Sequence, residues 1–74
     1  MASVTLSAVL TPEDSGYVAF CPELDIASQG ESIDEALANL KEAVEGFFET
    51  ASSNEVETRL KRPAFFTHFE VTRA

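Results

Sequence analysis

Carboxylates are the side chains of this sequence that could do chemistry, and five of them gather in the first half of the chain. They are Glu13, Asp14, Glu23, Asp25 and Glu31. Carboxylates that converge on two divalent metal ions about 4 Å apart can support phosphodiester hydrolysis. These five, however, lie in or beside turn-forming segments, where acidic residues are common for solubility. The pattern favours solvated charge or a partner-binding patch over a catalytic centre. We therefore expect no metal, no cofactor and no enzymatic activity.

Two further residues have reactive side chains. His68 is followed two residues later by Glu70, a pair that could transfer protons, but the sequence places no nucleophile beside it. We expect His68 to be a surface or interface residue. Cys21, the single cysteine, lies near Glu23 and Asp25, whereas a reactive thiol needs positive surroundings. We expect Cys21 to be a small buried residue, and one cysteine cannot form an intramolecular disulfide.

Three segments of alternating or β-branched residues are predicted to be strands. Residues 4–10 alternate apolar and polar side chains, residues 17–21 are aromatic and β-branched, and residues 24–28 alternate again. Residues 11–16 and 29–31 are rich in turn formers. The three strands should form an antiparallel meander.

A helix is predicted after Ser32, which begins a capping box with Glu35. The apolar positions then repeat every three or four residues, as they do in an amphipathic helix. These positions are Ile33, Ala36, Leu37, Leu40, Ala43, Val44, Phe47, Phe48 and Ala51. Residues 52–54 are a plausible helix end, and residues 55–63, which lack a clear period, are predicted to be a surface connection.

The last segment alternates again, with Phe65, Thr67, Phe69 and Val71 on one face, and is predicted to be a fourth strand. The fold class is then α+β with the order β-β-β-α-β, in a single domain over residues 1–74. We expect a four-stranded sheet in the order 3-2-1-4 with one helix packed on one face. An edge strand is a pairing surface for a second copy. The expected oligomer interface is Phe65, Phe66, Thr67, His68 and Phe69.

Size and charge limit the partners that such a chain can have. It has 74 residues, 13 of them acidic and five basic, for a net charge of −8. This charge repels nucleic acid and attracts a basic protein. No apolar run approaches the ~20 residues that cross a bilayer, and the N-terminus does not resemble a signal peptide. We therefore expect a cytoplasmic protein, and a homodimer or higher homo-oligomer because small domains commonly need such support.

Two motifs connect these features to a known family. The segment 16–24 reads GYVAFCPEL and the segment 28–36 reads SQGESIDEA. Together they resemble the HicB-like antitoxin family, with its GY-x-A-x-x-PEL hairpin and its S-x-G-[DE]-[ST]-x-x-EA helix start. The resemblance covers roughly residues 4–48. It implies a β-β-β-α-β fold likened to a partly degraded RNase H fold. It also implies binding to a small basic HicA-type toxin that degrades RNA, which the antitoxin neutralises.

Many members of that family also carry a C-terminal DNA-binding segment, whereas after the predicted fourth strand of this sequence we expect none. We therefore do not carry operator binding over to it. Charge and predicted exposure indicate the residues that contact the toxin: Glu13, Asp14, Tyr17, Glu23 and Asp25, with Glu42, Glu45 and Glu49 as a second patch. Two alternatives stay open. One is a stand-alone oligomeric domain without a toxin partner. The other is a minimal RNase H-like metal-dependent nuclease, which the absence of an Asp in residues 4–10 disfavours.

Overall fold

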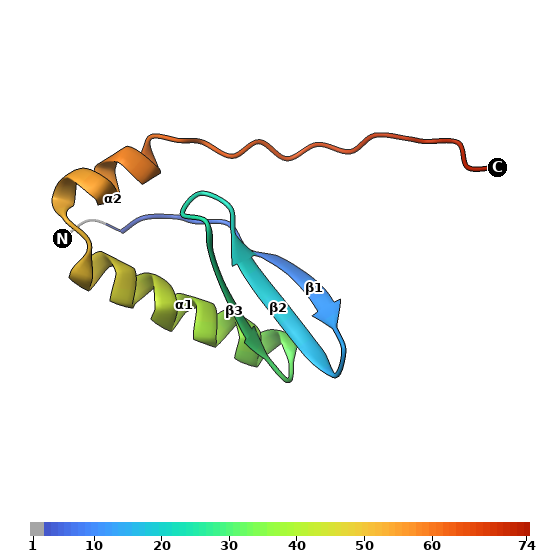
Figure 1. The fold of residues 1–74 in the computed structure, drawn as a ribbon, viewed down its shortest axis with the longest axis horizontal. Helices are drawn as coiled ribbons and strands as arrows, with labels where there is room; N and C mark the ends of the chain where they lie inside the picture. Colours follow the sequence, from blue (N-terminus) through green and yellow to red (C-terminus); the bar gives the residue numbers. More distant parts are fainter. Residues whose placement is uncertain (1–2) are drawn as a thin grey trace.

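The computed structural model describes residues 3–74 and contains a small sheet, two helices and a long extended C-terminal segment (Figure 1). The elements are β1 (Val9–Glu13), β2 (Gly16–Cys21), β3 (Ile26–Gly30), α1 (Ile33–Thr50) and α2 (Ser53–Leu60). The strands form an antiparallel sheet in the order β1-β2-β3, and α1 packs against it. The predicted meander followed by an amphipathic helix is thus present.

The strands are displaced along the sequence from their predicted positions. β1 pairs from Val9 to Glu13 rather than over residues 4–10, and β3 covers residues 26–30 rather than 24–28. Pro12 is accommodated because β1 is an edge strand, where a missing N–H leaves no ladder bond broken. Residues 22–25 form a turn closed by the bond from the Asp25 N–H to the Cys21 carbonyl, 2.8 Å long. The segment before Ile26 is therefore used for a turn.

The start of α1 agrees with the capping prediction in one of its two bonds. The Ser32 hydroxyl accepts from the Glu35 N–H at 3.0 Å. The Glu35 carboxylate accepts from the N–H of Glu31, at 2.9 Å, rather than from that of Ser32. The side chain of Glu35 therefore ties the end of β3 to the first turn of the helix.

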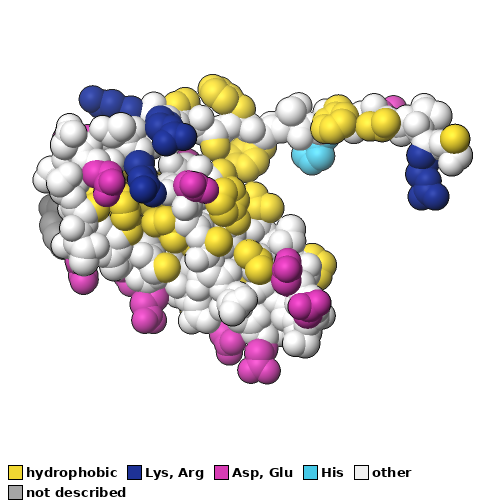
Figure 2. Space-filling model, viewed as in Figure 1, with side chains coloured by type: hydrophobic (Ala, Val, Ile, Leu, Met, Phe, Trp, Pro, Cys, Tyr) yellow, Lys and Arg dark blue, Asp and Glu magenta, His cyan; other side chains and the backbone are white. Residues whose placement is uncertain are grey.

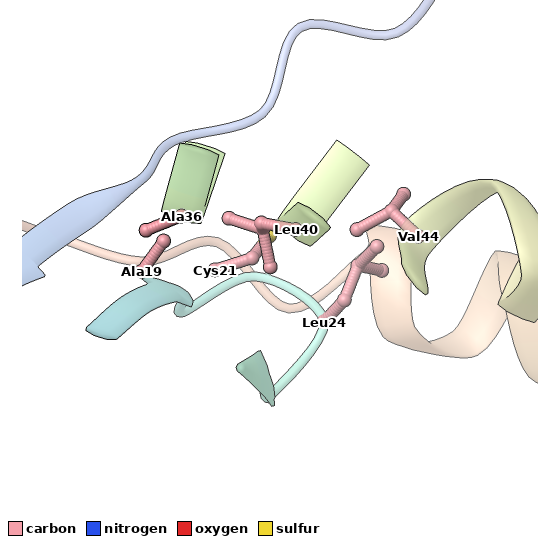
Figure 3. Close-up of a cluster of buried hydrophobic side chains, with 6 residues drawn as sticks. All are labelled: Ala19, Cys21, Leu24, Ala36, Leu40 and Val44. Atoms are coloured by element: carbon pink, nitrogen blue, oxygen red, sulfur yellow. The ribbon is translucent and has the colours of Figure 1, made fainter. Parts of the chain in front are cut away.

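The core lies between α1 and the sheet and consists of six buried residues (Figure 3). They are Ala19, Cys21, Leu24, Ala36, Leu40 and Val44. Half of these side chains are Ala or Cys, so the helix approaches the sheet closely. At Gly30 the approach is closest, because a Cβ there would lie 2.5 Å from the backbone nitrogen of Ala36. Glycine is thus required where β3 passes the first turn of α1.

The prediction of a surface connection over residues 55–63 was wrong, because residues 53–60 form α2. Its N-cap is Ser52, whose hydroxyl accepts from the Glu55 N–H at 3.1 Å. The Arg59 guanidinium holds α2 to the rest of the fold. It donates to the Leu24 carbonyl and lies over the Phe47 ring, 4.8 Å from its centroid.

The predicted fourth strand was also wrong, and with it the four-stranded sheet in the order 3-2-1-4 and the single helix. The sheet has three strands, and residues 63–74, the C-terminal arm, form an extended segment that makes no strand pairing within residues 3–74. Figure 1 shows the arm leaving α2 and projecting past the folded body on the side of β1. Phe65 and Phe69 are 88% and 85% exposed. The radius of gyration is 14.5 Å, against about 11 Å for a compact chain of this length.

Candidate partner-binding surfaces

An acidic recess lies at the end of the sheet where the β1–β2 hairpin turns. Its walls come from that hairpin, from the end of β3 and from the first turn of α1. It is lined by Glu13, Asp14, Ser15, Gly16, Tyr17, Gln29, Gly30, Glu31 and Glu35. The strand register explains the convergence, because Glu13 pairs with Gly16 and Tyr17 pairs with Gly30. Residues far apart in sequence therefore meet around one depression.

The chemistry of the acidic recess is that of a cation acceptor. It contains the carboxylates of Glu13, Asp14, Glu31 and Glu35 and the phenol of Tyr17. Carboxylates form strong charge-assisted hydrogen bonds with Lys and Arg side chains. Within residues 3–74, no group of three or more His, Cys, Asp or Glu residues is arranged to hold a metal ion. The carboxylates of the recess could accept hydrogen bonds from an ammonium or guanidinium group.

The second predicted patch is an exposed acidic stripe on α1. Glu42, Glu45 and Glu49 are spaced three and four residues apart, so they follow one side of the helix, and all three are exposed. Acidic side chains follow the edge of the molecule formed by α1 and the hairpin end (Figure 2). The stripe and the acidic recess together make this edge strongly negative.

Glu23 and Asp25 lie at the opposite end of β2 from the acidic recess. The Glu23 carboxylate accepts from the Ser7 N–H at 3.0 Å and from the Ser7 hydroxyl at 2.7 Å. The Ser7 hydroxyl lowers the pKa of Glu23 from its usual value. Asp25 is exposed in the turn, with φ at 57°. The structure thus brings Glu13, Asp14 and Tyr17 together but uses Glu23 to hold the N-terminal segment.

Cys21 and His68 occupy very different surroundings. Cys21 is 1% exposed, as predicted, and burial raises the pKa of its thiol, which donates to Glu23 at 3.5 Å. His68 is exposed on the C-terminal arm with its neighbours Phe66 and Phe69. A buried protonated thiol is a packing group rather than a nucleophile.

Sequence analysis missed Glu35 as a surface residue of the acidic recess and missed an apolar groove altogether. The apolar groove runs between residues 4–8 and one side of α1. Its apolar lining is Val4, Leu6, Ala8, Cys21, Leu37, Ala38, Leu40, Val44 and Phe48, and Asp34, Lys41 and Glu45 are at its polar edge. The available signal was the capping box with Ser32, which placed the Glu35 side chain at the start of the helix. No signal in the sequence indicated the apolar groove, because residues 4–8 were expected to pair in the sheet.

Comparison with known proteins gives one relative. Over 70 residues the chain is 34% identical to a UPF0150 protein of Helicobacter pylori, and the alignment covers 93% of this chain and 97% of that protein. The chain belongs to the UPF0150 family. The match extends over nearly the full length of both UPF0150 proteins, so it includes much more than the two short motifs.

The other comparisons add no relative of this UPF0150 chain. No protein-family profile matches it. No solved structure matches it. Among residues 3–74, no helix combines the length and the apolar character needed to cross a bilayer.

Proposed function

We propose that this UPF0150 chain is a HicB-like antitoxin-type module that binds and neutralises a small basic RNA-degrading toxin of the HicA type. It acts by covering the toxin and does no chemistry of its own. The observation that carries the proposal is the acidic recess, in which Glu13, Asp14 and Tyr17 meet Glu31 and Glu35. Such a surface is complementary to a Lys- or Arg-rich protein.

The distribution of charge supports a basic protein as the partner. The chain has a net charge of −8, and the acidic recess and the acidic stripe Glu42, Glu45 and Glu49 lie along one edge of the molecule. Opposite charges on two proteins raise the rate of encounter and help to orient the partners. Because exposed charges are screened by salt, the complex should weaken as ionic strength rises.

The sequence motifs that resemble the HicB-like family also support the proposal, because they build the acidic recess. Gly16 and Tyr17, which begin the first motif, line it, and Gly30, Glu31 and Glu35 of the second motif complete it. Glu23, in the PEL part of the first motif, bonds to Ser7 instead. We therefore assign partner contact to the recess residues and a scaffolding role to Glu23.

Binding to the product of the adjacent gene tests the proposal. If that gene encodes a small basic protein, the two purified proteins are titrated by calorimetry at low and at high salt. The test variant Glu13→Lys/Glu31→Lys reverses two charges in the acidic recess. The matched control Glu57→Lys reverses an exposed charge on α2, outside the recess.

We expect the test variant to bind at least about tenfold more weakly, since about 1.4 kcal/mol corresponds to a factor of ten. The control should bind much as the unmodified chain does. Equal affinity of test variant and unmodified chain would rule out the acidic recess as the contact. Failure to bind any basic protein encoded nearby would rule out the toxin partner.

A second candidate function is a self-assembling domain without a toxin partner. The exposed aromatic side chains of the C-terminal arm favour it, because Phe65, Phe66 and Phe69 are more than half exposed. If tagged protein is used as bait in an extract of its native cells and captures only further copies of the same chain, that result would support this candidate.

Addition of Mg²⁺ or Mn²⁺ tests the nuclease alternative, because a metal-dependent enzyme would gain thermal stability on binding the metal.

A further inference from the structure

Two apolar surfaces lack a partner within residues 3–74. One is the C-terminal arm, whose Phe65, Phe69 and Val71 are 88%, 85% and 76% exposed. The other is the apolar groove, where Val4 is 49% exposed and Leu37 is 44% exposed. Large apolar patches on a small protein usually mark an interaction site. The two surfaces occur on the same chain and do not contact each other.

The apolar groove is shaped to receive an extended peptide. One of its sides is residues 4–8, which lead directly into β1, and within residues 3–74 β1 pairs only with β2. The outer edge of β1 therefore has free backbone groups that an added strand could bond. The other side is α1, whose Leu37, Val44 and Phe48 would cover the apolar face of that strand.

The C-terminal arm has the length and the pattern for this groove. From Leu37 to Phe48 the apolar groove follows α1 over eleven residue steps, about 16 Å at the helical rise. From Phe65 to Val71 an extended chain advances six residue steps, about 20 Å. The apolar side chains of the arm alternate, so one face of it carries Phe65, Phe69 and Val71 together. That face could lie against α1 over the whole groove.

The charge of the folded body does not oppose this placement. The C-terminal arm, residues 63–74, contains one acidic residue, Glu70, and one basic residue, Arg73, so its formal charge is zero. The remaining acidic residues are all in the folded body, and two of them, Asp34 and Glu45, lie at the edge of the groove. A formally neutral arm can lie on the acidic body without adding repulsion between like charges.

We propose that the C-terminal arm of one copy lies in the apolar groove of a second copy, alongside residues 4–8 and β1, and that a reciprocal contact completes a symmetric dimer. The arm projects past its own body (Figure 1), in the position from which it can reach another molecule. Exchange of one segment between two identical chains buries the same surface twice and closes the assembly. The inference does not depend on the proposed function.

Light scattering coupled to size-exclusion chromatography tests the proposal with full-length protein. The arm variant is Phe65→Ser/Phe69→Ser, and the groove variant is Leu37→Glu. The control Phe66→Ser alters the other face of the arm, and the control Ala43→Glu adds a charge at an exposed α1 position outside the groove. None of the five substituted positions belongs to the buried core, so circular dichroism should show each variant folded.

We expect the unmodified chain and both controls to have the mass of two chains. The arm variant and the groove variant should each have the mass of one chain. A single-chain mass for the unmodified protein would overturn the proposal. So would a two-chain mass for either the arm variant or the groove variant.

Mixing the two test variants separates exchange from folding back onto the same chain. The arm variant has an intact groove and the groove variant has an intact arm, so a mixture restores one arm–groove contact. With different tags on the two variants, a mixed dimer should form, and neither variant should dimerise alone. If each arm occupied its own groove instead, the mixture would stay at the mass of one chain, which would refute the exchange.

Discussion

Glu23 shows how one side chain can organise a segment distant in sequence. Its carboxylate accepts from the backbone and the hydroxyl of Ser7, sixteen residues earlier, and from the thiol of Cys21. These bonds hold the segment before β1 against the turn after β2. Glu23 appeared in the sequence only as a turn carboxylate, because nothing in the local pattern indicates a partner so far away.

The stability of the fold should therefore depend on the ionisation of Glu23. Its pKa is lowered in the folded chain, mainly by the Ser7 hydroxyl, so its contribution is present above the ordinary pKa of 4.5 and is lost as the pH falls through the folded pKa. We expect Glu23→Gln to lower the free energy of unfolding at pH 7 by roughly 1 kcal/mol. The deficit should shrink in acid. Urea unfolding at several pH values measures it, and a deficit that does not change with pH would contradict the assignment.

Substitution by Ala should have opposite effects on the stability of the fold at Gly30 and at Gly46. A Cβ on Gly30 would lie 2.5 Å from the Ala36 nitrogen and 2.8 Å from the Glu35 carbonyl carbon, both backbone atoms that cannot easily move. We expect Gly30→Ala to destabilise the fold by about 1–3 kcal/mol. A Cβ on Gly46 meets nothing within 4 Å, so Gly46→Ala should stabilise α1 by about 1 kcal/mol. Chemical denaturation of both variants checks the pair, and equal stability of Gly30→Ala and the unmodified chain would contradict the close approach.

At the scale of elements, the helices and strands that depend on local sequence pattern could be predicted from the sequence. An element whose formation depends on a neighbouring strand could not. The hairpin, the following strand and α1 were predictable from alternation, turn residues and helical spacing. The alternation of residues 65–71 correctly indicates an extended backbone, but a strand also requires a neighbour to bond, and this chain provides none within residues 3–74. α2 was missed because its eight residues show little apolar period, although Ser52 and Glu55 form a recognisable cap.

Arg59 should be the residue that fixes the position of α2. Its guanidinium donates to the Leu24 carbonyl and lies over the Phe47 ring, so it connects α2 with both the β2–β3 turn and α1. We expect Arg59→Ala to lower the free energy of unfolding by about 1–2 kcal/mol. Arg62→Ala, at an exposed position just after α2, is the matched control and should change stability little. Thermal unfolding compares the two, and similar melting temperatures would show that Arg59 does not anchor the helix.

At the scale of the whole molecule, the chain exposes much apolar surface in comparison with the small amount that its core buries. Six residues form the buried core, while the aromatic side chains of the C-terminal arm are largely exposed. Fully burying a Phe side chain contributes about 1.5–3 kcal/mol, so covering Phe65 and Phe69 would add an amount comparable with much of the stability of a small domain. The prediction of self-association came from the length of the chain and from the expected edge strand over residues 65–71. The structure adds two matching surfaces, the arm and the groove, through which association could occur.

Charge is the property of the whole chain that was most informative from the sequence. The net charge of −8 predicted a basic protein as partner, and the fold gathers recess and stripe carboxylates along one edge. The sequence could not predict which of the proposed contact residues lie close together in space. Their proximity depends on the register of the β1–β2 hairpin and on the position of the first turn of α1. Three of the eight, Glu13, Asp14 and Tyr17, converge in the acidic recess.

If the gene beside this one encodes a small basic protein that cleaves RNA, the most direct test of the proposed antitoxin function is whether the chain inhibits that cleavage. The chain is titrated into a fixed amount of that protein with a fluorescent RNA substrate. We expect cleavage to fall to background at a fixed, stoichiometric ratio of the two proteins, and the Glu13→Lys/Glu31→Lys variant to require a large excess. RNA cleavage that continues unchanged in the presence of excess unmodified chain would contradict the antitoxin function.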